Sequence, residues 1–150
     1  MRNPAHRLAA RTALLLAGLV LSTCSNPVSD EKKGPLVRTL WDSGLQTGRH
    51  IFYWDGRDNA GKTVAAGTYR CWMESESDRE AIDMTAVDGT KGKPADSTGT
   101  GIGHWYMNTS PLHYLLEQNF PEPFYAKDGT NISLEIPEPA YVKLTIHSGS

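Results

Sequence analysis

Cysteine, clustered basic residues and long apolar runs are all scarce in this sequence. Only two cysteines occur among 150 residues, Cys24 and Cys71, which excludes a framework of several disulfides. No predominantly apolar stretch reaches the length of about 20 residues that a membrane-spanning helix needs. Lys32 and Lys33 are adjacent but belong to no larger basic cluster. Because nucleic-acid binding depends on clustered Lys and Arg, we expect no nucleic-acid partner.

The N-terminus has the pattern of an export signal. Arg2, Arg7 and Arg11 precede the apolar run Ala13–Leu21, which is too short for a membrane span but suits the apolar region of a signal peptide. We therefore expect residues 1–23 to be a signal peptide and the chain to be exported. Without these residues the chain has 127 residues, 12 basic and 17 acidic, and a formal charge of −5.

The end of the apolar run carries a second signal. Leu21-Ser22-Thr23-Cys24 resembles a bacterial lipobox, although Thr23 departs from the usual Gly, Ala or Ser. The resemblance implies lipid attachment at Cys24, with residues 24–34 as a tether, and Ser25 in the next position implies the outer membrane. An ordinary secretory signal or an uncleaved anchor remains the alternative.

The first third of the body, residues 35–75, reads as three strands. We expect them at 37–41, 49–54 and 67–74, with a turn at 42–48 between the first two. Alternation in the third strand places Cys71 on an apolar face, where a free cysteine is usually a small core residue rather than a nucleophile.

A long polar turn joins the second and third strands. Asp55 and Asp58 are expected to accept backbone N–H groups, and glycines are expected where a Cβ would be crowded. Calcium binding of the EF-hand type fails because Arg57 and Ala66 occupy ligand positions, although another kind of calcium site stays open. We expect a structural role for these residues: Trp54, Asp55, Gly56, Asp58, Gly61, Gly67 and Tyr69.

This turn and its strands resemble a known module. The segment 36–73 closely resembles the second half of the immunoglobulin-like (Ig-like) module shared by the flagellar hook-capping protein and the C-terminal sorting domains of type IX secretion substrates. In that family the matching residues form the framework of a small β-sandwich. They are Gly48, His50, Trp54, Asp55, Gly56, Asp58, Gly61, Val64, Gly67 and Tyr69.

The last third, residues 115–150, resembles the first half of the same module. "LLEQNFPEPF" is similar to the opening element of the family, with Glu122 where Asn is common, and two alternating strands follow it. The two halves therefore stand in reversed order. Circular permutation, strand exchange between chains and two incomplete modules could each produce this order, and we favour permutation because neither half can cover its own apolar face.

The middle, residues 76–114, has no counterpart in the family. Residues 79–87 are a further candidate strand, and 88–103 reads as a long mobile Gly/Ser/Thr-rich loop. "SPLHYLLEQ" fits a short helix with Ser110 as N-cap. His104 and His113 lack the spacing and the further ligands of a metal site, and Ser110 lacks a nucleophile signature. Trp105 and Tyr106 are the candidate contact patch.

The sequence thus predicts a small all-β sandwich of the Ig-like or fibronectin type over residues 35–150. The arrangement that we favour is a circular permutation of the family module. We expect no catalytic residues, no metal and no cofactor, and hence a non-enzymatic binding or assembly module anchored in the cell envelope. Its partner would be an envelope protein or a surface polymer. The alternatives are a secretion-sorting module, a strand-exchanging surface subunit, and a carbohydrate or peptidoglycan binder that stacks sugars on Trp105 and Tyr106.

Overall fold

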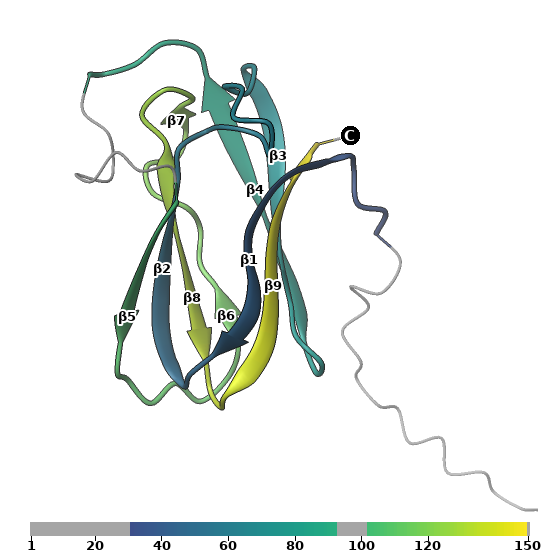
Figure 1. The fold of residues 1–150 in the computed structure, drawn as a ribbon, viewed down its shortest axis with the longest axis vertical. Coiled ribbons are helices and arrows are strands. Elements are labelled where there is room, and N and C mark those ends of the chain that lie inside the picture. Colours follow the sequence, from purple (N-terminus) through teal and green to yellow (C-terminus); the bar gives the residue numbers. More distant parts are fainter. Residues whose placement is uncertain (1–30, 93–101, 150) are drawn as a thin grey trace, which may run out of the picture.

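Two facing sheets make up the computed structural model, which describes residues 31–92 and 102–149 (Figure 1). The described residues contain strands and no helix. In chain order the strands are β1 (Leu36–Leu45), β2 (Gly48–Trp54), β3 (Gly67–Glu74), β4 (Arg79–Val87), β5 (Ile102–Met107), β6 (Leu115–Leu116), β7 (Phe124–Tyr125), β8 (Thr130–Ile136) and β9 (Ala140–Ser148). The expected all-β sandwich is therefore confirmed.

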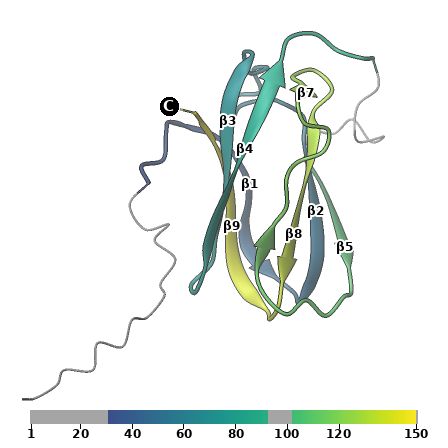
Figure 2. The ribbon, with the colours of Figure 1, turned by 180° about the vertical axis from the view of Figure 1, so that it is seen from behind.

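The order of strands brings the two ends of the described chain together. One sheet has the order β1-β9-β3-β4-β7 and the other β5-β2-β8-β6. The last strand, β9, lies between β1 and β3 and pairs antiparallel with both (Figure 2). Every strand pair is antiparallel except β4 with β7. Except for β3 and β4, the strands that are neighbours in a sheet are not consecutive in sequence, which is typical of sandwich folds.

Alternating apolar residues build the core between the sheets. Strand β8 buries Ile132, Leu134 and Ile136 completely, and every second residue between them is partly exposed. The same period places Val142, Leu144 and Ile146 of β9 and Tyr69, Cys71 and Met73 of β3 in the core, as expected. Burying each of the larger side chains contributes about 1.5–3 kcal/mol. The core therefore holds the sheets together.

Strand β1 is longer than expected. Its residues 42–45, which we expected in a turn, pair with 140–143 of β9. Only residues 46–47 connect β1 to β2. The Asp-Ser-Gly sequence looks like a turn, but the available β9 partner keeps it extended.

Two expectations for the middle of the chain were wrong. The expected loop 88–103 ends earlier than predicted, because β5 begins at Ile102 and pairs with β2; residues 93–101 lie outside the described part. No helix forms around Ser110. Leu115 and Leu116 instead pair with β8 as β6, and the Glu117 N–H donates to the Ser133 carbonyl at 2.9 Å. The sheet offers these backbone groups partners that outweigh helix propensity.

Contacts between the ends fix their proximity. The Ser148 N–H donates to the Pro35 carbonyl oxygen at 3.0 Å, and Nδ1 of His147 lies 2.7 Å from the Gly34 carbonyl oxygen. Within one chain, β9 therefore completes the sheet begun by β1 and β3, which is the strand arrangement that our favoured permutation requires. Whether this order arose by permutation of the family module stays a prediction.

Candidate functional site

The polar turn between β2 and β3 hydrogen-bonds to itself. One carboxylate oxygen of Asp58 accepts the N–H groups of Ala60 and Lys62, each at 2.9 Å, and Asp55 accepts the N–H of Arg57 at 3.1 Å. The Trp54 indole donates to the Arg57 carbonyl at 2.8 Å. These are the Asx-type contacts expected of Asp55 and Asp58, so both carboxylates are engaged in shaping the turn.

The same turn covers the free edge of β1. The Asn59 N–H donates to the Val37 carbonyl at 2.9 Å, and the Asn59 side chain accepts the Thr39 N–H at 3.1 Å. The Arg38 guanidinium also donates to the Asp58 carbonyl at 2.7 Å. Asn59 thus gives hydrogen-bond partners to the backbone of an edge strand. Residues 37–39 of this edge are thereby covered and cannot accept a further strand.

The glycines of the turn divide into two kinds. Gly56 has a φ of +66°, and a Cβ there would lie 2.0 Å from the Ala126 carbonyl oxygen. Gly61 and Gly67 also have positive φ, but nothing lies within 4 Å of a Cβ at either position. Crowding, which we expected at all three, is therefore real only at Gly56; the other two need only glycine's backbone freedom.

Strand β5 carries the candidate contact patch. It pairs with β2 over six residues, from Ile102 opposite Trp54 to Met107 opposite Arg49. Trp105 stands opposite Ile51 on the outer face and is 41% exposed. Tyr106, 46% exposed, points the other way: its ring lies 5.0 Å from that of His50 and its hydroxyl donates to the Thr47 carbonyl at 2.8 Å. The two patch residues thus face opposite sides of the sheet.

A histidine pair fastens β5 to the inner side of the sandwich. Nδ1 of His50 lies 2.9 Å from Nε2 of His104, and Nε2 of His50 lies 2.8 Å from the Gln46 carbonyl oxygen. Because a carbonyl only accepts, Nε2 of His50 carries the proton, and His104 then donates to Nδ1. The His104 ring also stacks on Phe52, with centroids 4.5 Å apart and 3° between the planes.

The environment of this pair favours neutral rings. Loss of hydration lowers the pKa of His50, which is only 2% exposed, although its hydrogen bond to Gln46 opposes the shift. Loss of hydration also lowers the pKa of His104, and the neighbouring His50 lowers it further. The sequence had associated His104 with His113; the structure instead places His104 against His50.

The outer face of the other sheet holds a tryptophan that the sequence did not single out. Trp72 on β3 is fully buried although it points away from the core. The Arg79 guanidinium lies 4.2 Å from its ring centroid and the Lys33 ammonium 5.6 Å, and both cations also pair with Glu74. These cation–π contacts, together with the aliphatic parts of the Arg79 and Lys33 side chains, cover the ring.

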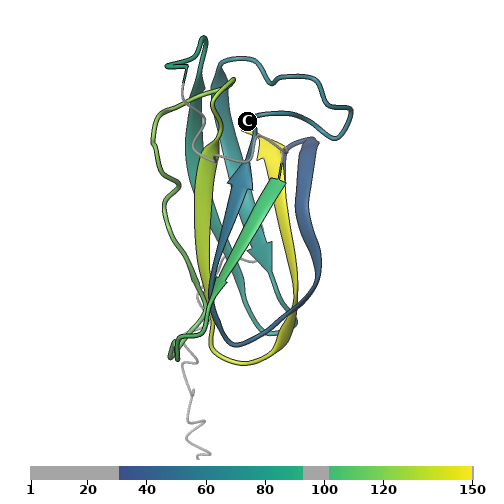
Figure 3. The ribbon, with the colours of Figure 1, turned by 60° about the vertical axis from the view of Figure 1, so that its left-hand side comes forward.

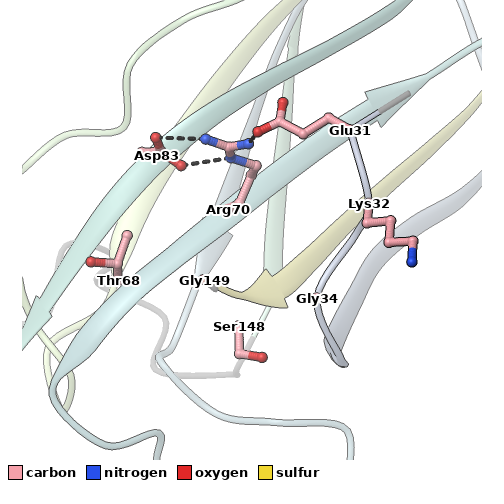
Figure 4. A pocket seen from close by; sticks show the side chains of 8 residues that line it. All are labelled: Glu31, Lys32, Gly34, Thr68, Arg70, Asp83, Ser148 and Gly149. Atoms are coloured by element: carbon pink, nitrogen blue, oxygen red, sulfur yellow. Dashed lines mark hydrogen bonds and ion pairs between the residues drawn. The ribbon is translucent and has the colours of Figure 1, made fainter. Parts of the chain in front are cut away.

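Beside Trp72, Arg70 joins the first described residues to the sheet. Its guanidinium forms a forked pair with Asp83, at 2.6 and 2.8 Å, and a second ion pair with Glu31 (Figure 4). A pocket of about 290 Å³ lies here between residues 31–34, β3 and the end of β9. Since Arg70 is already shared by two carboxylates, it is not free to bind an anion.

Cys71 is not a candidate nucleophile. Its thiol is completely buried, and burial raises its pKa far above the usual range, so the reactive thiolate is suppressed. Among residues 31–92 and 102–149 no three His, Cys, Asp or Glu side chains gather as metal ligands, and no helix there could cross a membrane. Cys24, the proposed lipid site, lies outside the described residues.

Comparison with known families supports part of the sequence interpretation. Residues 26–79, a little over a third of the chain, match the family model of the FlgD Ig-like domain. This segment includes β1, β2, the polar turn and β3. No curated protein and no solved structure matches the chain. The resemblance to the Ig-like module of the flagellar hook-capping protein, a structural and non-catalytic family, is thereby confirmed for this segment.

Proposed function

We propose that this chain is a non-enzymatic, lipid-anchored Ig-like module that binds or assembles a partner at the bacterial cell envelope. The match of residues 26–79 to the FlgD Ig-like domain carries the proposal. The environment of the polar groups supports it, because the turn carboxylates of Asp55 and Asp58 bond to backbone and the Cys71 thiol is buried. Fold alone does not define function, so the binding role needs its own test.

Anchoring depends on Cys24. A cysteine that carries acyl chains holds a protein on a membrane through burial of the chains, and stable anchoring takes more than one of them. Cys24→Ser is expected to release the chain from the membrane fraction or to stop its maturation. Acyl labelling and membrane fractionation measure this, with Cys71→Ser as the control that retains the label. Unchanged labelling of Cys24→Ser would reject the anchor.

Binding is expected to depend on β5. Trp105→Ala removes the exposed ring on the outer face of the strand, whereas Leu112→Ala removes an apolar side chain that is 93% exposed and lies outside the strands. Chemical cross-linking in intact envelopes should yield complexes with the parent chain and the Leu112 variant, but fewer with the Trp105 variant. Equal yields from all three would contradict a binding role for β5.

A carbohydrate or peptidoglycan binder is the second candidate function. The exposed ring of Trp105 favours it, since a flat aromatic surface on a strand can stack against a sugar ring. Binding to glycan arrays that Trp105→Ala abolishes would support this role. Binding that survives the substitution would remove it.

A further inference from the structure

We propose that β5 is a self-association edge: a second copy of this chain pairs its own β5 antiparallel to this one, with the two-fold axis at Trp105. The inference rests on the proposed binding role and names its partner. It starts from the edges of the two sheets, which differ in how they are protected.

Three of the four sheet edges are short or covered. Strands β6 and β7 have two residues each. Strand β1 has irregular register with β9 at two places, and the polar turn bonds to residues 37–39 of its outer edge. Strand β5, by contrast, pairs with β2 in regular register over six residues and has no other strand beside it among the described residues (Figure 3).

The composition of β5 favours strand addition. Edge strands usually resist pairing through charged residues, proline or bulges, and Ile-Gly-His-Trp-Tyr-Met contains neither an acidic residue, a lysine, an arginine nor a proline. In an antiparallel pair, alternate residues direct both backbone groups away from the existing partner. The outer edge of β5 therefore presents N–H and C=O groups that only another extended strand can satisfy in regular order.

A second copy fits this edge because the strand is complementary to itself. A two-fold axis at Trp105 sets Trp105 against its counterpart, Gly103 against Met107, and His104 against Tyr106. Each pair lies on one face of the sheet, as antiparallel pairing requires. The missing side chain at Gly103 leaves room for Met107, and the two indole rings meet on the outer face.

Charge does not oppose this contact. Met107 stands opposite Arg49 on β2, and Arg49 forms an ion pair with Glu117. Arg49 also stands opposite Glu135 on β8, so the outer face beside β5 carries one positive and two negative side chains, whereas β5 itself carries no Lys, Arg, Asp or Glu. Pairing two copies joins their four-stranded sheets into one continuous sheet without bringing unpaired like charges together.

The size of the contact sets its strength. One strand pair of this length buries less than the roughly 1,200 Å² at the low end of specific interfaces, so the dimer is weak in dilute solution. Attachment to one membrane raises the effective concentration of the second copy and strengthens the association. Weak pairing that depends on crowding at a surface is the behaviour that an assembly module needs.

Sedimentation of the purified full chain in detergent tests the association. We expect a dimer fraction that rises with concentration. Trp105→Lys should raise the dissociation constant at least tenfold, whereas Leu112→Lys, the same kind of change at an exposed position outside the strands, should leave it within about twofold. Matching thermal unfolding midpoints for the two variants will establish that Trp105→Lys folds. A parent chain that stays monomeric, or equal dissociation constants in the two variants, would overturn the proposal.

Disulfide cross-linking in the membrane tests the register. Trp105→Cys should form a disulfide-linked dimer on mild oxidation, faster than Leu112→Cys, whereas the parent chain should form none, because Cys71 is buried and the proposed lipid occupies the sulfur of Cys24. Linkage of Trp105→Cys to a different protein would overturn the second copy as partner but leave the proposed binding role standing. No linkage from Trp105→Cys, together with no envelope complex of the parent chain, would overturn both.

Discussion

At the scale of single residues, Gly56 and Gly61 separate two effects that usually occur together. Both have positive φ, but only Gly56 faces a backbone oxygen, that of Ala126. Gly61→Ala is expected to cost about 1–2 kcal/mol for the left-handed backbone alone. Gly56→Ala should cost a further ~1–3 kcal/mol, since the new methyl group forces apart two packed segments. Urea denaturation of both variants measures the difference, and equal losses would contradict the crowding.

The histidine pair predicts a dependence of stability on pH. Both pKa values are lowered from 6.5 in the folded chain, so the unfolded chain binds more protons between 6.5 and the lowered values. The neutral pair therefore makes its full contribution to the free energy of unfolding above about pH 7. This contribution falls as the pH drops from 6.5 to the lowered pKa values, and it does not change further below them. Protonating both rings would also set two N–H groups against each other.

Removing one of the two rings should weaken this dependence. His104→Gln retains a donor for Nδ1 of His50 but no longer titrates in this range. We expect a smaller loss of unfolding free energy between pH 7 and pH 5 than in the parent chain, measured by urea denaturation at several pH values. The same loss in both chains would show that the histidine pair does not cause it.

At the scale of elements, Asn119 holds the segment between β6 and β7 against β8. Its buried amide lies within hydrogen-bond distance of the Pro121 carbonyl, at 2.9 Å, and of the Thr130 hydroxyl, at 3.0 Å. The Gln118 amide donates to its oxygen at 2.7 Å. These contacts give a structural reason for asparagine in the "LLEQNFPEPF" element.

Asn119→Ala is expected to destabilise the fold by about 1–3 kcal/mol, because it leaves the buried Thr130 hydroxyl and neighbouring groups with fewer partners. Asn108→Ala, the same change at an exposed position, should cost less than about 0.5 kcal/mol. Chemical denaturation compares the two variants. Equal midpoints would contradict the conclusion that the buried hydrogen bonds of Asn119 stabilise the fold.

Strands in which apolar and polar residues alternate clearly could be predicted from the sequence. The apolar period located β2, β3, β8 and β9, and the polar turn showed its aspartates and glycines directly. Strand β5 could not be found in this way, because its inward residues are His104 and Tyr106, which do not look apolar. The histidine pair was missed for a related reason: His50 and His104 are 54 residues apart in the chain, and only the β2–β5 pairing brings them together.

Trp72 was missed because its burial has an unusual source. Alternation with the inward-facing Cys71 puts Trp72 on the outer face of β3, where exposure would be expected. Lys33 and Arg79 cover its ring from two separate segments of the chain. The sequence around Trp72 does not indicate such contacts. Trp105 is the opposite case. The sequence identified it as a candidate contact residue, but the face of the sheet on which it lies follows from its pairing with Ile51.

At the scale of the whole molecule, the position of β9 makes the order of the halves testable. Because residues 34–35 lie within hydrogen-bond distance of 147–148, a short linker from Gly149 to Gly34 can join them, and new ends can open between Gly92 and Ile102. Gly34 must stay glycine, since a Cβ there would lie 2.0 Å from the Ser148 carbonyl oxygen. We expect the rejoined chain to have its strands in the usual order of the hook-capping module.

We expect this rejoined chain, without residues 1–33, to fold, because every strand pair is retained and domain ends that lie close together tolerate rejoining. Its thermal midpoint should lie somewhat below that of the parent, because the contacts of Lys33 with Trp72 and Glu74 are lost. A control opened between Lys143 and Leu144 divides β9, which pairs with both β1 and β3, and should not fold. Trp105→Lys in the rejoined chain removes association through β5, so light scattering should then find monomers. Dimers that persist in this background would mean that β9 completes the sheet of another chain, and failure of the rejoined chain to fold would contradict the permuted order.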